Sequence, residues 1–193
     1  MKRHMRAAVL ALTVIAVLAC GMLSGCAAKM SDEEAKTLLR DLIPRSQALN
    51  EIFFGEGIAL QEADPEAVDS VSGAQYYRVA SDYPYQTVQQ IRDEAQQVFT
   101  SDYLQNSVYP MAFDGVEDHQ PRYVDRDGVL HMDITANSFA LLTQIDIESA
   151  RVTDTGYCVV QVLLDYTQGE TGGTMTVTLR QENGVWLLDS PTY

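Results

Sequence analysis

The hydrophobic periodicity of this chain changes once, near residue 122, and that change limits the folds open to it. Before it, apolar residues recur at the three- and four-residue spacing of helices, as over residues 38–43. After it, apolar and polar residues alternate, most regularly over residues 174–179. Such alternation predicts strands with one buried and one wet face. We therefore expect helices, one strand, further helices, and then four or five antiparallel strands.

Local signals mark the predicted element ends. Capping boxes begin at Ser31 and Thr87, where a hydroxyl faces the third helical residue, Glu or Gln. Pro44 is expected to kink or restart the first helix, and Pro110 to stop a later one, because proline lacks the amide donor. Gly55 is placed to end the first helix.

Turn signals order the second half. Residues 125–128 end in Asp-Gly and residues 183–184 are Asn-Gly, both typical of hairpins. A further strand is expected over residues 75–80. Together these elements predict an α+β domain, with N-terminal helices packed on one curved antiparallel sheet, an arrangement that resembles cystatin-like and NTF2-like folds.

The first residues have the features of an export signal. A cationic start precedes an apolar run over residues 7–19, which is short for a membrane span of about 20 residues. Residues 23–26, Leu-Ser-Gly-Cys, resemble the lipobox of bacterial lipoproteins. Small residues before Cys26 suit a peptidase cleft, and its thiol can carry acyl chains such as palmitate.

These features predict how the chain is divided and where it is located. Residues 1–25 would be removed by cleavage between Gly25 and Cys26, residues 26–31 would be a lipidated tether, and residues 32–193 a single domain. The protein would then be held at the cell membrane by lipid on Cys26, outside the cytoplasm. The alternatives are an ordinary signal peptide cut nearby or an uncleaved anchor.

The charge narrows the possible partners. All 27 acidic residues follow the predicted cut, whereas three of the 13 Lys and Arg precede it, so the mature formal charge is −17. Such a domain repels nucleic acid and anionic lipid, and a charged partner is expected to be basic. Acidity that serves only solubility is the alternative. Cys158 is the one cysteine after Cys26, and its apolar surroundings predict a buried, inert thiol.

The usual signatures of catalysis are missing from the sequence. His119 and His131 have no metal-ligand spacing, and no nucleophile elbow, P-loop or dinucleotide fingerprint occurs. Asp125 and Asp127 begin like a calcium loop but lack its later ligands. We therefore expect no enzyme activity, cofactor or metal. Tyrosines gather over residues 76–109 and are interpreted as the rim of the core or as a recognition surface.

Several stretches together resemble the IseA family of DL-endopeptidase inhibitors. The similarity covers about residues 75–193 and is carried by residues 76–79, 85–88, 98–103, 123–130 and 183–193. The resemblance implies inhibition by protein–protein binding of NlpC/P60-type cell-wall hydrolases, whose active-site cleft a loop of the inhibitor blocks. The lipobox departs from the family and implies action near the membrane.

The inhibitory loop cannot be transferred residue by residue, so acidity and position guide the choice. Residues 114–120, with Asp114, Glu117, Asp118 and His119, are the predicted partner-binding loop, and residues 168–173 are the second candidate. The alternative function is a small-ligand-binding lipoprotein of the cell envelope, which would need a pocket between helix and sheet. A pocket enzyme is the third possibility.

Overall fold

The computed structural model describes residues 30–61, 65, 67–69, 71–117, 119–138, 145–154, 158–164 and 173–193. The leader, with Gly25 and Cys26, lies outside these residues, so cleavage and lipidation stay predictions. Residues Ser31–Tyr193 form one compact unit. Within the described part of the chain, no helix has the length and apolar character to cross a membrane.

The described elements confirm the predicted α+β class. The helical elements are α2 (Asp32–Phe53), α3 (Val88–Ala95), the short α4 (Ser101–Tyr103), and the π-helical segments η1 (Leu104–Val108) and η2 (Pro110–Asp114). The strands are β1 (Ala67–Val68), β2 (Gln75–Arg78), β3 (Tyr123–Arg126), β4 (Val129–Asp133), β5 (Ile145–Asp154), β6 (Cys158–Leu164), β7 (Thr174–Glu182) and β8 (Val185–Leu188).

The strands form two antiparallel sheets and not the single curved sheet that was expected. One sheet has the order β1-β2-β4-β3 and the other the order β5-β6-β7-β8. The register gives the reason, because β4 pairs with β2 on one side and β3 on the other. With both of its edges occupied, β4 cannot pair with the next strand, and β5 begins a second sheet with β6.

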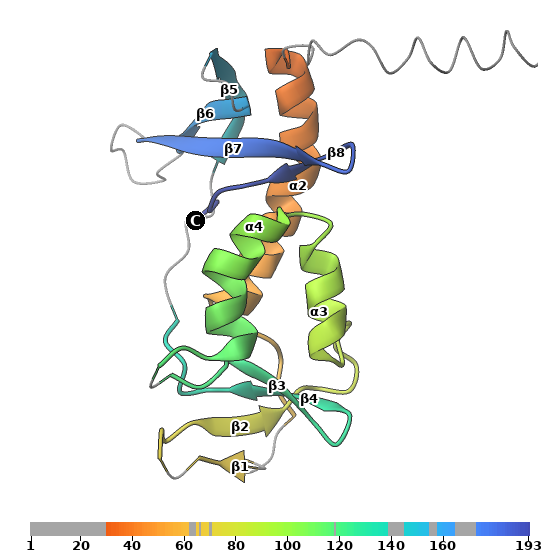
Figure 1. Cartoon of the computed structure of the whole chain (residues 1–193), viewed down its shortest axis with the longest axis vertical. Helices are drawn as coiled ribbons and strands as arrows, with labels where there is room; N and C mark the ends of the chain where they lie inside the picture. Colours follow the sequence, from red (N-terminus) through yellow and green to blue (C-terminus); the bar gives the residue numbers. More distant parts are fainter. Residues whose placement is uncertain are drawn as a thin grey trace, which may run out of the picture. The chain divides into compact units, whose positions relative to one another are not determined.

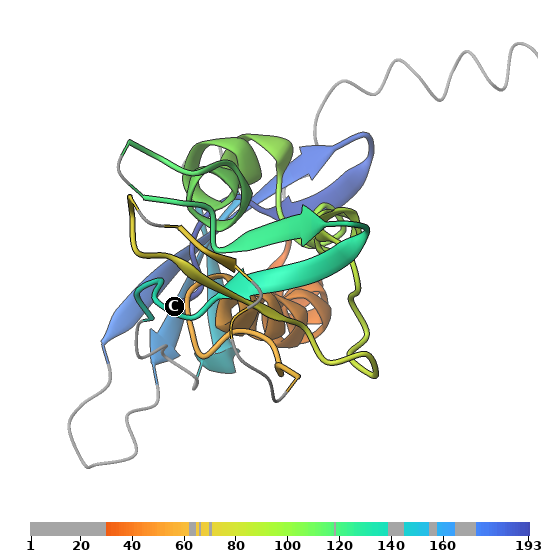
Figure 2. The same cartoon turned by 90° about the horizontal axis from the view of Figure 1, so that it is seen from below.

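α2 connects the two sheets (Figure 1). At its start, the Asp32 carboxylate accepts a hydrogen bond from the Val152 amide of β5, with an N–O distance of 2.8 Å. At its end, the Tyr123 hydroxyl of β3 donates to the Ile52 carbonyl at 2.7 Å. Figure 2, seen from below, looks along α2 with the β1–β4 sheet in front of it.

The predicted capping boxes are confirmed at both helices. Ser31 caps α2 and Thr87 caps α3, each with the reciprocal side-chain bond. Pro44 lies inside α2, which continues past it to Phe53. The prediction that Pro110 stops a helix is wrong. Pro110 is the first residue of η2 and follows Tyr109, which has helical dihedral angles, so the helical backbone continues through the proline.

The C-terminal tail is fastened to α2 by buried polar contacts. The Thr192 hydroxyl lies 2.9 Å from the Ser46 hydroxyl and accepts a 2.9 Å hydrogen bond from the side-chain amide of Asn50, Nδ2. All three residues are buried. The Tyr193 ring lies against Phe54, with centroids 4.9 Å apart. The tail after β8 therefore stabilises the end of α2.

Large side chains fill the space between α2 and the strands. Leu39, Leu49, Leu130 and Leu188 are among the fully buried residues. His131 is buried as well, with Nδ1 2.9 Å from the Val129 carbonyl oxygen, so it is a satisfied core residue.

The tyrosines divide between core and surface. Tyr76, Tyr103 and Tyr109 are buried, whereas Tyr77, Tyr83 and Tyr85 are half-buried. The first three therefore belong to the core and not to a recognition surface. Cys158 begins β6, but its side chain is not among those described, so its burial stays a prediction.

Candidate functional site

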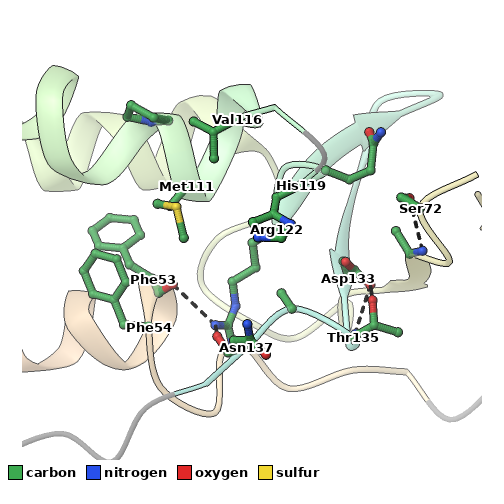
Figure 3. Close-up of a pocket in the computed structure, with 14 residues that line it drawn as sticks. Phe53, Phe54, Ser72, Met111, Val116, His119, Arg122, Asp133, Thr135 and Asn137 are labelled. Carbon is green, nitrogen blue, oxygen red and sulfur yellow. Dashed lines mark hydrogen bonds between the residues drawn. The ribbon is translucent and has the colours of Figure 1, made fainter.

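A partly open cleft of about 170 Å³ lies where the end of α2 meets η2 and the segment after β4 (Figure 3). Phe53, Phe54 and Met111 form an apolar side. The remaining lining is mainly polar and comes from Ser72, His119, Gln120, Arg122, Asp133, Thr135 and Asn137. The cleft therefore combines an apolar wall with several polar groups, of which Arg122 and Asp133 are charged.

Arg122 is a buried cation in this lining, with 5 % of its surface exposed. Its Nη2 donates to the Gly55 carbonyl at 2.6 Å, just past the end of α2. Its Nη1 lies 3.4 Å from the carbonyl oxygens of Phe53 and Asn137, which are long contacts. The cation thus sits at the negative end of the helix dipole and supplies donors to terminal carbonyl groups.

The guanidinium of Arg122 is nevertheless incompletely satisfied. Its Nε is buried and has no hydrogen-bond partner among the described residues. No carboxylate in the described part of the chain lies within ion-pair distance of it. Buried arginines are normally paired with an anion, and among the described residues this cation has no such partner.

Asp133 is the buried anion of the cleft, also 5 % exposed. Its Oδ1 accepts hydrogen bonds from the Gln75 amide at 2.8 Å and from the Thr135 amide and hydroxyl at 3.0 and 2.8 Å. These donors hold the carboxylate in a fixed orientation. Its Oδ2 accepts no hydrogen bond from any described residue, and so can still accept one.

Burial and the Asp133 charge together affect the neighbouring Tyr76. Burial is the larger cause and the nearby carboxylate the second, and they raise the pKa of Tyr76 to about 12. The Tyr76 hydroxyl therefore stays protonated and donates to the Pro121 carbonyl at 2.8 Å. This bond fixes the backbone directly before Arg122.

The predicted partner-binding loop forms one wall of the same cleft. Gly115, with φ +77°, turns the chain out of η2. Val116 and His119 then exchange two backbone hydrogen bonds, of 3.0 and 2.8 Å. Both residues line the cleft, so the loop and the cleft are parts of one site.

The four predicted loop residues have different roles. Asp114 is engaged within the chain, because its Oδ1 lies 2.8 Å from Nη2 of Arg92. Glu117 is exposed at the tip, with φ +48°, and His119 is exposed while lining the cleft. Asp118 lies outside the described residues, as does the second candidate loop except for Gly173.

Arg92 fixes the base of this loop. Its guanidinium carbon lies 4.3 Å from the Tyr109 ring centroid and 4.8 Å from that of Phe113. Cation–π contacts of this kind hold the side chain while it pairs with Asp114. The loop therefore starts from a fixed point on η2.

Arg122 and Asp133 were not predicted as site residues. The hairpin register could have indicated that they are neighbours, because a two-residue turn at residues 127–128 places residue 122 opposite residue 133. Among the described residues, no group of three or more His, Cys, Asp or Glu side chains is placed to hold a metal ion.

Comparison of the chain with protein-family models and with curated proteins finds no match.

Proposed function

We propose that this protein is an extracytoplasmic lipoprotein, anchored through Cys26, that inhibits peptidoglycan DL-endopeptidases of the NlpC/P60 type by protein–protein binding. On this proposal the protein is a binding protein and not an enzyme. The lipobox at residues 23–26 supports the anchor, and the resemblance over residues 75–193 supports the partner class.

The observation that carries the proposal is the preorganised acidic loop beside a cleft. Arg92 holds Asp114 at the base, and the Val116–His119 turn presents Glu117 at the tip. Because Val116 and His119 are joined by two backbone hydrogen bonds before a partner binds, these two residues lose little conformational entropy on association. The position of the loop at the cleft rim suits insertion into the groove of a hydrolase.

The net charge of the domain supports the same partner class. With a mature formal charge of −17, the domain attracts a basic enzyme surface over a long range. Such steering mainly raises the association rate and weakens with salt. Inhibition is therefore expected to be strongest at low ionic strength.

A wall-digestion assay tests the proposal. The full chain in detergent is added to purified NlpC/P60 domains acting on isolated cell walls, and release of soluble fragments is followed. Inhibition at micromolar protein supports the proposal, and full digestion in the absence of any measurable binding rejects it.

A charge reversal at the loop tip locates the contact. Glu117→Lys should weaken inhibition about tenfold, because an exposed acidic group facing a basic partner becomes repulsive. Asp82→Lys is the matched control, since it reverses an exposed charge in the turn before α3. Equal weakening by both variants would indicate that inhibition depends on the net charge of the domain and not on a contact at Glu117.

Binding of a small ligand is the second candidate function, and the cleft favours it. The site differs from the one expected, because the space between α2 and the described strands is filled by buried side chains. The cleft lies instead beyond the end of α2.

A further inference from the structure

We propose that the cleft binds the carboxyl end of an α-amino acid or peptide, with the ligand carboxylate at Arg122 and its neighbouring N–H donating to Asp133. The proposal stands apart from endopeptidase inhibition, since either can hold when the other fails. It rests on two buried charges that the fold places side by side and leaves incompletely satisfied.

The backbone explains why the two charges face one ligand. The Asp133 amide donates to the Arg122 carbonyl at 2.8 Å, continuing the β3–β4 register in which Tyr123 is opposite Met132. Directly opposed residues project to the same face, with Cα atoms about 5 Å apart. Arg122 and Asp133 therefore enter the cleft from adjacent positions.

The side chains then diverge and do not pair. Arg122 extends toward the Phe53 carbonyl at the end of α2, and Asp133 turns toward Thr135 (Figure 3). Asp133 also accepts a hydrogen bond from the Gln75 amide. Each is held by backbone groups, so neither moves to neutralise the other. The opening between them offers a cation on one side and an anion on the other.

This pairing selects for a ligand with both kinds of group. A guanidinium matches a carboxylate in geometry and charge, and the free Oδ2 of Asp133 matches an ammonium or amide N–H. A simple anion meets repulsion from Asp133, and a simple cation meets repulsion from Arg122. An α-amino acid carries both a carboxylate and an N–H, one for each side of this opening.

The volume of the cleft and its apolar wall further restrict the class of ligand. About 170 Å³ is well below the roughly 300–1,000 Å³ of pockets for drug-sized ligands, so a single residue fits better than a longer chain. Phe53, Phe54 and Met111 provide an apolar contact, and Met111 is 43 % exposed. An amino acid with a medium-sized aliphatic side chain meets all three requirements.

Calorimetric titration of the full chain in detergent tests the proposal with four probes. Leucine has all the proposed features, N-acetyl-leucine imitates a peptide end, leucinamide lacks the carboxylate, and 4-methylpentanoate lacks the N–H. We expect leucine or N-acetyl-leucine to bind at least about tenfold more tightly than the last two. Tighter binding of leucine indicates a free amino acid as ligand, and tighter binding of N-acetyl-leucine indicates a chain end.

Two variants separate recognition from folding. Asp133→Asn should bring the ratio of leucine to 4-methylpentanoate affinity close to one, a change that a purely structural role of Asp133 does not produce. Ala136→Trp, at a half-exposed position in the lining, should block binding while the exposed Ser138→Trp leaves it intact. Equal affinity for leucinamide, an unchanged ratio in Asp133→Asn, or no heat from any probe at millimolar concentration overturns the proposal.

Discussion

Arg122 and Asp133 lie opposite each other in the extension of the β3–β4 ladder, and their charged groups do not form an ion pair. Arg122 instead serves the end of α2, and Asp133 the start of β2. The two residues thus join α2, β2 and β4 around the cleft. Their arrangement makes the cleft a structural junction between the end of α2 and the start of β2.

Removing the Arg122 guanidinium should destabilise the fold. Arg122→Met leaves the Gly55 carbonyl without its 2.6 Å donor, so we expect a loss of about 2–4 kcal/mol in the free energy of unfolding, measured with urea. Arg40→Met is the control, because Arg40 forms an exposed ion pair with Glu148 and should cost less than about 1 kcal/mol. Equal losses would show that Arg122 does not hold the end of α2.

The backbone next to Arg122 should not tolerate a side chain at Gly57. Gly57 has φ +88°, and a Cβ there would overlap the Met132 sulfur, which accepts a 3.4 Å contact from the Ile58 amide. Gly57→Ala should cost about 2–4 kcal/mol in unfolding free energy, from strain and overlap together.

Gly184→Ala separates those two causes. Gly184 has φ +84° and no atom within 4 Å of an added Cβ, so its substitution should cost only about 1 kcal/mol. Urea unfolding of both variants gives the comparison. If Gly57→Ala costs no more than Gly184→Ala, the close approach to Met132 contributes nothing.

The C-terminal tail should contribute to stability through Thr192. Thr192→Val removes the hydroxyl bonded to Ser46 and Asn50 and leaves the buried Asn50 amide without its acceptor. We expect a loss of about 1–3 kcal/mol by chemical unfolding. The exposed Thr176→Val on β7 should change stability by less than about 0.5 kcal/mol.

Alkaline pH should destabilise the protein through Tyr76. Its pKa is raised from 10.0 to about 12 in the folded state, so the folded protein binds its proton more tightly than the unfolded chain. The stability from this proton is fully present below pH 10 and is lost as pH rises through about 12. Burial also raises the pKa of Tyr103 and Tyr123, so phenolate absorbance should show several tyrosines titrating late. Tyr76→Phe should lower the absorbance change near pH 12 by the amount of one tyrosine. A titration near 10 would contradict the burial of this hydroxyl.

Local sequence signals predicted local structure well. The capping boxes at Ser31 and Thr87 and the turns at residues 127–128 and 183–184 formed as expected, because each depends on a few adjacent residues. The division into two sheets was not foreseen, since periodicity identifies strands but not their neighbours. The acidic loop was located by its charge, yet its contact with the cleft depends on packing between η2 and the end of α2.

Arg122 shows most clearly what the sequence could not reveal. Hairpin register could have placed it opposite Asp133, and an ion pair would have been the natural inference from two opposed charges. In the structure Arg122 instead donates to the Gly55 carbonyl, just after α2. That outcome depends on contacts between residues more than sixty positions apart.

Hydrogen exchange of the full chain, with and without a saturating NlpC/P60 domain, tests most directly where the partner binds. We predict slower exchange of backbone amides over residues 111–117 and 119–120, at the loop and the cleft. Protection confined to β5–β8, or no change at saturation, would contradict it.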